Sequence, residues 1–349
     1  MSFPFPHIPV DRLGPTDPRA SARLVGQRHH FTPTRLSDYG LVVPGLRFSE
    51  SDEILYHKVG AFATMKPEPE LGLGIAHDLG GTLTESHRHE LVMVRVLGPV
   101  EVVTSGGVLE IGSRLQRAVL AALAISANHT VSSDQLAQIL WQDRPPASRD
   151  NTLQTYIARL RNVVGHDRIS TAEEHGYQLH VAGDELDAMV FERLANQAAT
   201  IRSEPDRCLG MCRQALALWR GVPFGELVDD DPFRLEAIRL DEVRLFVIEL
   251  RLECELALGR GEVVVGALEA LVEEYPYRER MWHLLIAALS LCGRRVEALR
   301  ACDQLRKVLG DVGLEPTIEI RHLEDDIIDE DPAVRPRLRF LLAQNGSGH

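Results

Sequence analysis

The sequence contains no long hydrophobic run, and its N-terminus has no basic region followed by an apolar stretch. A membrane helix needs roughly 20 consecutive apolar residues, and a secretory signal needs that basic-then-apolar order. We therefore expect a cytoplasmic protein with no membrane partner. Lysine occurs only at Lys58, Lys66 and Lys307, so arginine carries almost all of the positive charge.

Cysteine is also scarce, and its pattern excludes a disulfide framework. The cysteines are odd in number and lie in apolar-periodic segments, at Cys208, Cys212, Cys254, Cys292 and Cys302. This pattern predicts reduced, packed thiols. Cys208 and Cys212 are one helical turn apart and could bind a metal, but no second Cys/His pair at ligand spacing accompanies them. We predict no metal site, no cofactor and no catalytic residues.

Composition and charge are those of a folded protein with an uneven distribution of acid. The chain has 349 residues, of which 44% are hydrophobic and 26% charged, which excludes global disorder and favours two domains with an appendage. The net charge of -13 argues against nonspecific coating of nucleic acid. Residues 92–182 carry 8 basic and 8 acidic residues, whereas residues 183–349 carry 21 and 32. The middle of the chain is thus free to approach phosphates.

Residues 1–90 mix proline and glycine without a period of 2 or 3.6, which predicts an irregular or disordered extension. Two histidine groups, at 29–30 and 87–89, lack supporting ligands and are interpreted as solvated. A metal-dependent hydrolase built on them is an alternative that metal analysis would test. Met93 directly precedes the first patterned strand, so the extension could instead reflect a start-site error, which N-terminal sequencing would settle.

Residues 91–182 predict a small domain that begins with a sheet and continues with helices. Short β-rich runs separated by glycine and proline indicate an antiparallel sheet. Helical periodicity then recurs three times, with Ser132 or Ser133 as an N-cap and with Pro145 and Pro146 before the third helix. The predicted strands are 92–97, 100–103 and 108–111, and the predicted helices are 114–125, about 133–141 and about 147–164.

The third helix has the most informative pattern. A buried stripe is predicted at Leu153, Ile157, Leu160 and Val164. The opposite face consists of short polar side chains and one arginine, at Ser148, Asn151, Thr152, Thr155, Arg159 and Asn162. Asn and Arg can bond base edges in a major groove, Thr can touch a thymine methyl or a phosphate, and N-terminal amides can hold phosphate. An ordinary amphipathic helix with a solvated face fits the periodicity equally well.

A hairpin follows the third helix and favours the DNA-binding alternative. Alternating strands at 168–171 and 176–181 flank the polar turn 172–175, which is typical of the wing of a winged helix. The order strand, helix, helix, helix, hairpin is that of a DNA-binding domain. We add Arg149 and Tyr177 to the candidate DNA contacts, although Tyr177 could instead pack the hairpin. Arg161 lies beside the buried stripe and could pair with an acid internally.

Residues 183–332 predict an all-helical repeat region, followed by a tail at 333–349. Helix pairs around Gly259 and Gly293 resemble each other at close to the roughly 34-residue tetratricopeptide period. Such helices stack into a superhelix whose concave surface binds peptides or proteins. The predicted fold class is therefore mainly α with a small β component: a winged helix-turn-helix domain, then an all-α tetratricopeptide-like domain.

This order of parts resembles the Streptomyces antibiotic regulatory protein (SARP) family of transcriptional activators. The resemblance is carried by the segments 94–102, 151–161, 176–179, 216–224, 275–299 and 313–332. It implies a winged helix joined to a bacterial transcriptional activation domain, with no enzymatic activity. It also implies activation of secondary-metabolite genes through promoter direct repeats, bound as a dimer on double-stranded DNA.

The resemblance further implies contact with RNA polymerase and its sigma factor through the loop before the third helix, at Trp141, Gln142, Asp143 and Arg144 and on to Pro146. The larger family members add a nucleotide-hydrolysing domain, but this chain has no G-x-x-x-x-G-K-[ST] motif. No alternating strands and helices of a receiver domain precede the winged helix. An adaptor whose winged helix binds protein rather than DNA remains the alternative, and it predicts no salt-dependent DNA affinity.

Overall fold

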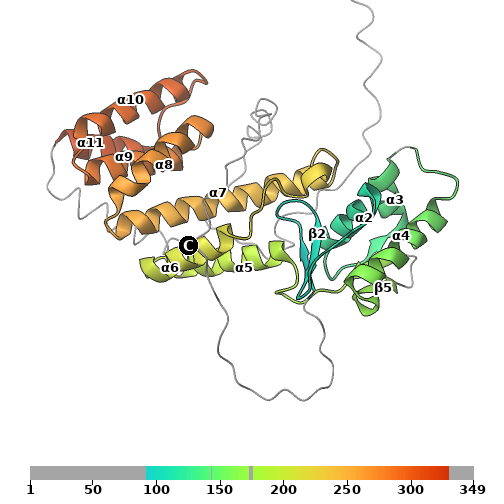
Figure 1. Cartoon of the computed structure of the whole chain (residues 1–349). Coiled ribbons are helices and arrows are strands. Elements are labelled where there is room, and N and C mark those ends of the chain that lie inside the picture. Colours follow the sequence, from blue (N-terminus) through green and yellow to red (C-terminus); the bar gives the residue numbers. More distant parts are fainter. Residues whose placement is uncertain (1–91, 143, 173–175, 330–349) are drawn as a thin grey trace, which may run out of the picture. The chain divides into compact units, whose positions relative to one another are not determined.

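The computed structural model describes residues 92–142, 144–172 and 176–329, which form mainly helices with two small sheets (Figure 1). The predicted fold class, a winged helix followed by an all-helical repeat region, is confirmed. The predictions for residues 1–90, for Asp143, for the turn residues 173–175 and for the tail lie outside the described residues.

The first sheet consists of the antiparallel strands β1 (Met93–Arg95), β2 (Glu101–Thr104) and β3 (Gly107–Leu109). Val94 pairs with Val102, and both side chains are buried. β1 is shorter than predicted for a specific reason. The amides of Val96 and Leu97 donate to the carboxylate of Asp187, at 2.8 and 3.1 Å, rather than to a neighbouring strand.

Three helices follow, α2 (Arg114–Ile125), α3 (Ser133–Trp141) and α4 (Arg149–Val164). The first two begin with complete capping boxes. In each, the side chain of the N-cap serine accepts from the third helical amide, and the glutamine side chain accepts from the serine amide. Ser113 and Gln116 cap α2, and Ser132 and Gln135 cap α3. The N-cap of α3 is therefore Ser132, one of the two residues that the sequence offered.

The second sheet has the strand order β4-β6-β5 and includes one strand that the sequence did not predict. β5 (Ile169–Ala172) and β6 (Gly176–Leu179) form the predicted hairpin, preceded by the short helix η3 (His166–Arg168). β4 (Val131–Ser132) pairs with β6 just before α3 begins. A strand of two residues is too short to show a period of 2, which explains the omission.

The rest of the described chain is helical, and no helix in these ranges is both long and apolar enough to span a membrane. The elements are α5 (Asp187–Thr200), α6 (Pro205–Leu216), η4 (Gly225–Leu227), α7 (Phe233–Ala257), α8 (Gly261–Glu274), α9 (Glu279–Leu291), α10 (Arg295–Gly310) and α11 (Ile318–Ile328).

The predicted repeat is visible in two matching turns. Gly259 ends α7 with a φ of 78°, and Gly293 ends α9 with a φ of 77°. In each turn the residue after the glycine donates its amide to the carbonyl five residues earlier, at 2.9 Å. This is the Schellman motif, which needs a left-handed residue that glycine supplies without steric cost. The same turn therefore connects α7 to α8 and α9 to α10.

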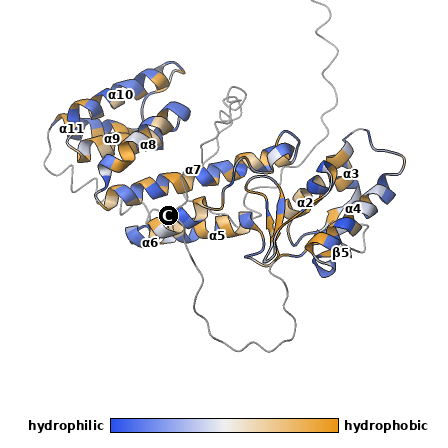
Figure 2. Ribbon diagram, in the orientation of Figure 1, coloured by the Kyte–Doolittle hydropathy of each residue, from blue (hydrophilic) through white to orange (hydrophobic). Residues whose placement is uncertain are grey.

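Two hydrophobic clusters stabilise the described chain, and α7 contributes to both. Its faces divide as follows: Leu240, Val247 and Leu250 belong to the first cluster, and Leu245, Leu252 and Leu256 to the second. The second cluster is completed by α8 to α11. A helix buried on two faces has no single apolar stripe, so polar and apolar residues alternate along it in Figure 2.

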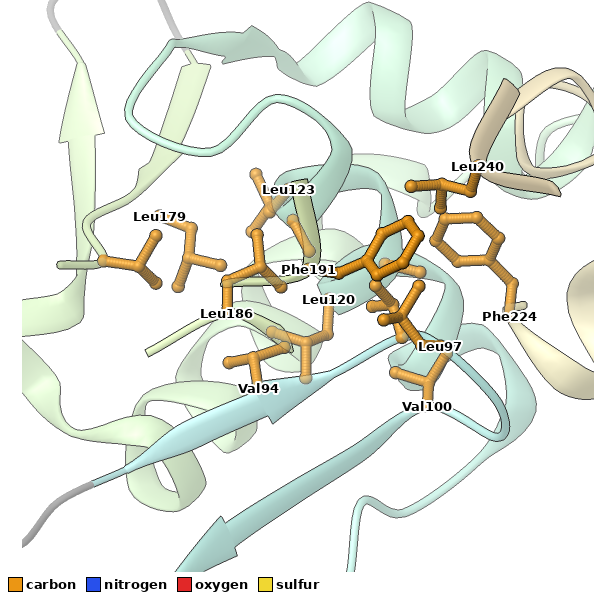
Figure 3. Close-up of a cluster of buried hydrophobic side chains, with 14 of the residues drawn as sticks. Val94, Leu97, Val100, Leu120, Leu123, Leu179, Leu186, Phe191, Phe224 and Leu240 are labelled. Atoms are coloured by element: carbon orange, nitrogen blue, oxygen red, sulfur yellow. The ribbon is translucent and has the colours of Figure 1, made fainter. Parts of the chain in front are cut away.

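The first cluster spans the predicted boundary between residues 182 and 183. Leu97 and Leu120 of the winged helix are fully buried together with Phe191, Phe224 and Leu240 of the helical region (Figure 3). Aromatic and leucine side chains of this size dominate the energetics of a core. The winged helix and the first helices of the repeat region therefore share one core.

Asp187 joins the two regions by hydrogen bonds as well. Its carboxylate is 1% exposed and accepts from the amides of Val96 and Leu97, while an Arg220 nitrogen lies 3.5 Å away. Arg220 also bonds Glu101 at 2.7 Å, and its own amide donates to the carbonyl of Leu97 at 2.8 Å. Burial raises the pKa of Asp187, opposed by these amides and by Arg220.

Candidate DNA-binding surface

The buried stripe of α4 is confirmed. Leu153, Ile157, Leu160 and Val164 are each at most 2% exposed and belong to the first cluster. Their 4-3-4 spacing places them on one side of the helix, against α2 and α3. The orientation of α4 is thus fixed by packing, and its opposite face is turned outward.

The outward face of α4 consists of short polar groups with one arginine. Ser148, Asn151, Thr155, Arg159 and Asn162 are exposed, and Thr152 is half-buried. Gln154 and Ala158 are exposed as well, although the sequence pattern did not single them out. Both residues follow from the helical spacing of the buried stripe, because every position of α4 that lies off this stripe is expected to be accessible. The outward face is therefore wider than predicted.

Two threonine hydroxyls on this helix donate to backbone carbonyls one helical turn earlier. Thr152 Oγ1 donates to the carbonyl of Ser148 at 3.0 Å, and Thr155 Oγ1 donates to that of Asn151 at 2.8 Å. A threonine hydroxyl used in this way keeps its lone pairs and its methyl group for an outside partner. These side chains can accept a hydrogen bond or touch an apolar group without moving.

The N-terminus of α4 differs from those of α2 and α3 because no side chain caps it. Ser148 occupies the N-cap position, but it makes no capping bond, and its hydroxyl instead lies 3.4 Å from Thr152 Oγ1. The first amides of a helix are unsatisfied within the helix, and they carry the positive end of its dipole. The Arg149 amide donates to the carbonyl of Pro146 at 3.0 Å, so the amides that follow it are the donors this helix end can offer to an anion. In α2 and α3 the capping serine occupies one of these amides.

The arginines of α4 have three different environments. Arg149 bonds Asp134 of α3 at 3.0 Å and lies 3.4 Å from Asp150, so its charge is partly neutralised. Arg159 is exposed and makes no ion pair or hydrogen bond with the described residues. Arg161 bonds to uncharged groups of the wing, at Ile169 and Thr171. The sequence left open an internal acid as the partner of Arg161, but its partners are a backbone carbonyl and a hydroxyl.

Tyr177 does not lie on the outward face. It is 8% exposed and pairs across the sheet with Val131 of β4, the strand that the sequence did not predict. Burial raises the pKa of its phenol, with a smaller opposing effect of the nearby charge on Arg161. The structure thus places Tyr177 in the hairpin packing, the other role considered for it, and removes it from the candidate surface.

The loop before α4 is largely exposed. Trp141 is half-buried at the end of α3, while Gln142, Arg144, Pro145 and Pro146 are exposed. Gln142 adopts a positive φ of 51°, which ends the helix abruptly. The side chains of Gln142, Arg144, Pro145 and Pro146 are therefore accessible to a partner just before the N-terminus of α4.

The arginines of the winged helix differ in whether an acidic side chain neutralises them. Those turned toward the helical region are neutralised there: Arg114 pairs with Asp230, Arg117 with Glu226 and Arg168 with Glu185. The Arg168 pair is bidentate, with both contacts at 2.6 Å. Among the described residues of the winged helix, Arg95, Arg144, Arg159 and Arg161 form no ion pair, and all but Arg95 of β1 lie on α4 or on the loop before it. Net positive charge therefore remains on the α4 side.

The cysteines are free thiols, and all except the half-buried Cys292 are buried, as predicted. Cys208 and Cys212 are fully buried in α6, next to the buried Cys254 of α7. The described ranges hold no group of three or more His, Cys, Asp or Glu side chains arranged to bind a metal ion.

Two family models match the chain in the order of its parts. The model described as "Transcriptional regulatory protein, C terminal" matches residues 111–179, and the one described as "Bacterial transcriptional activator domain" matches residues 186–328. The first match contains α2, α3, α4 and the wing, and the second contains the helices from α5 to α11.

Individual relatives agree with these matches. Regulatory protein DnrI of Streptomyces peucetius is 34% identical over 256 residues, covering 70% of this chain and 94% of that protein. Regulatory protein AfsR of Streptomyces coelicolor is 35% identical over 244 residues, covering 68% of this chain but 24% of AfsR, so the chain spans about a quarter of that relative.

A solved structure has the same fold. Mycobacterium tuberculosis EmbR, in complex with a low-affinity phosphopeptide, matches with a TM-score of 0.68 and 28% identity, covering 73% of this chain and 70% of that one. The order of domains, the family models and the near full-length match to DnrI lead to one conclusion: the chain belongs to the SARP family of transcriptional regulators.

Proposed function

We propose that this protein is a sequence-specific transcriptional activator that inserts α4 into the major groove of promoter DNA. The observation that carries the proposal is the sorting of arginines on the winged helix. Arginines that face the helical region are neutralised by its acids, whereas Arg159 on the outward face of α4 has no partner among the described residues. A surface that binds phosphates needs cations without partners of their own.

The outward face of α4 supplies groups for base recognition. Asn151 and Arg159 are the candidates for base edges, because Asn matches adenine and Arg matches guanine in bidentate geometry. Thr155 can contact a thymine methyl, and Asn162 can bond a base or a phosphate. The uncapped N-terminus at Ser148, together with Thr152 and Arg149, would hold backbone phosphate. Base contacts would set the sequence preference, and phosphate contacts the register.

The family relationship extends the proposal to promoters and polymerase. We infer binding to direct repeats as a dimer, with the segment at Trp141, Gln142, Asp143 and Arg144 touching RNA polymerase and its sigma factor. The exposure of Gln142 and Arg144 supports a protein contact there. The relation to DnrI and AfsR supports a regulated set of secondary-metabolite biosynthetic genes.

The experiment selects DNA with the full-length protein. Duplexes recovered from a random-sequence library are labelled, and their affinity is compared with that of scrambled duplexes by fluorescence anisotropy. We expect enrichment of one motif and a log-log salt dependence with a slope near -0.9 per phosphate contacted, measured between about 50 and 200 mM salt. If no motif is enriched and no duplex binds at low salt, the adaptor function replaces this one.

A further inference from the structure

A cavity of about 340 Å³ lies where the winged helix meets the helical region. Its lining residues come from both parts of the chain, and four of them are apolar while two carry charge: Pro99, Val100, Arg117, Phe224, Glu226 and Leu227. Sites for small molecules are concave and usually occupy about 300 to 1,000 Å³. This cavity is therefore large enough for a small ligand that touches both parts at once.

The apolar and the charged lining residues differ in their exposure. Val100, Phe224 and Leu227 are buried, and the first two belong to the shared core (Figure 3). In contrast, the side chains of Arg117 and Glu226 are 29% and 51% exposed. The cavity thus has a buried apolar end and a charged end that solvent reaches. A small molecule with an apolar body and one charged head group matches this arrangement.

The wall formed by Phe224 is fixed by contacts with the winged helix. The Phe224 amide donates to the carbonyl of Val96 at 2.8 Å, and Phe224 holds a left-handed φ of 62° that bulky residues rarely adopt. A Cβ atom on the next residue, Gly225, would lie 2.9 Å from Pro99 Cα, so glycine permits the close approach of the two loops. The cavity is therefore formed before any ligand binds, which lowers the cost of binding.

Arg117 is oriented to bind a carboxylate. Its Nη1 donates to the backbone carbonyls of Ile111 and Gly112, at 3.0 and 2.7 Å, which fixes the plane of the guanidinium. Its Nε and Nη2 both donate to one oxygen of Glu226, Oε1, with the Nε bond at 2.8 Å. These two nitrogens form the edge that pairs with both oxygens of a carboxylate in a bidentate contact. The present pair with Glu226 therefore does not use the full geometry of this edge.

We propose that the cavity binds a small carboxylic acid with an apolar body, whose carboxylate replaces Glu226 on the Nε and Nη2 edge of Arg117. The apolar body then lies against Val100, Phe224 and Leu227. An acid fits better than an amine because Arg117 is held by two backbone carbonyls, while Glu226 is the more exposed partner and can turn into water. The proposal is independent of the proposed DNA-binding function, since α4 contributes no residue to the lining.

The test uses the full-length protein and three probes that share one apolar body and differ in charge: 4-phenylbutyrate, its amide and 4-phenylbutylamine. Binding is measured by ligand-observed NMR titration. We expect the acid to bind with a Kd of about 1 mM, which is typical of a ligand with roughly a dozen heavy atoms. The amide and the amine should bind about tenfold more weakly, because neither presents a carboxylate to Arg117.

Two substitutions in the cavity should change the affinity for 4-phenylbutyrate in opposite directions. Arg117→Gln removes the guanidinium edge and should weaken binding about tenfold, whereas Glu226→Gln removes the competing carboxylate and should strengthen binding roughly threefold. Arg114→Gln is the matched control, because Arg114 lies on the same helix and pairs with Asp230 but does not line the cavity.

The opposite signs separate ligand binding from a structural role of the ion pair. Arg117→Gln and Glu226→Gln break the same pair, so an effect through stability alone would weaken binding in both. Circular dichroism confirms that each variant is folded before the titration. No binding of the acid to the unmodified protein, stronger binding of the amine, or weaker binding of the acid to Glu226→Gln would each overturn the proposal.

Discussion

The outward face of α4 and the helical repeats use arginine in opposite ways. In the repeats, arginines are matched with buried or half-buried acids: Arg278 bonds Glu249 at 2.6 Å and Glu242 at 2.8 Å, and Arg280 pairs with Glu253. On the outer side of α4, Arg159 has no such partner among the described residues. Paired arginines stabilise the helices, and unpaired ones remain available for a ligand. Substitutions in the two regions should therefore affect different properties.

The largest effect should follow from breaking a buried network in the repeats. Arg278→Ala leaves Glu249, which is 8% exposed, without its partner. We expect the free energy of unfolding to fall by about 3 to 5 kcal/mol in urea denaturation, because an unpaired buried charge is costly. Arg306→Ala is the matched control, since its pair with Glu324 is more exposed and should contribute at most about 1 kcal/mol. Equal losses of stability for the two variants would contradict this interpretation.

Acid should weaken the repeat region through His283. Burial, followed by the charge on Arg280, lowers the pKa of His283 to about 4. The unfolded chain has a histidine pKa near 6.5, so it binds a proton that the folded chain excludes as the pH falls from about 6.5 to 4. Stability should drop over this window by at most about 3 kcal/mol.

The measurement is the urea midpoint as a function of pH. Below neutral pH the urea midpoint should fall as the pH falls, and we call this part of the curve the acid limb. His283→Gln should make the acid limb less steep between pH 6.5 and 4, whatever its effect at neutral pH. Asp241 acts in the opposite sense, because burial raises its pKa to about 6, so its contribution to stability is lost as the pH rises through that window. Asp241→Asn should therefore steepen the acid limb. A limb that is unchanged in both variants would show that these groups do not titrate as described.

The corresponding substitution on α4 should affect binding and spare stability. Arg159→Ala should weaken binding to the selected duplex by roughly 1 to 3 kcal/mol, with the unfolding free energy changed by less than about 0.5 kcal/mol. Weaker binding confined to the selected duplex indicates base recognition, and equal weakening on scrambled DNA indicates a phosphate contact. Arg207→Ala, in an exposed pair with Glu204, is the control. Unmodified affinity for Arg159→Ala would remove this residue from the DNA surface.

The smallest effect concerns helix capping. Ser132→Ala removes a complete capping box and should cost about 1 kcal/mol of stability. Ser148→Ala removes no capping bond and should cost little, while weakening DNA binding if the Ser148 hydroxyl holds phosphate together with the α4 amides. Thermal denaturation and anisotropy distinguish the two. Similar loss of stability in both variants would mean that Ser148 caps its helix after all.

The features that sequence predicts well are those with a local period. The stripe from Leu153 to Val164 repeats at helical spacing and needed no tertiary information. The turns at Gly259 and Gly293 were found for a similar reason, because each ends a helix at the same place in a repeat. The wing hairpin alternates along both strands, and the structure confirms it.

The features that sequence missed depend on contacts between distant segments. β4 exists because two residues find a partner in β6, and this pairing also buries Tyr177. The neutral partners of Arg161 lie on the wing, and no local pattern distinguishes them from an acid. The uncapped start of α4 depends on the rotamer of Ser148, whose residue type alone favours a cap.

The shared core has a consequence for building chimeric regulators. Cutting the chain between residues 182 and 183 would strip Phe191, Phe224 and Leu240 from the apolar side chains of the winged helix, and would remove the carboxylate of Asp187 from the amides that it holds. A transplanted DNA-recognition module should instead carry α5, α6 and α7 with it. The splice then falls at Gly259, where one repeat ends and the next begins.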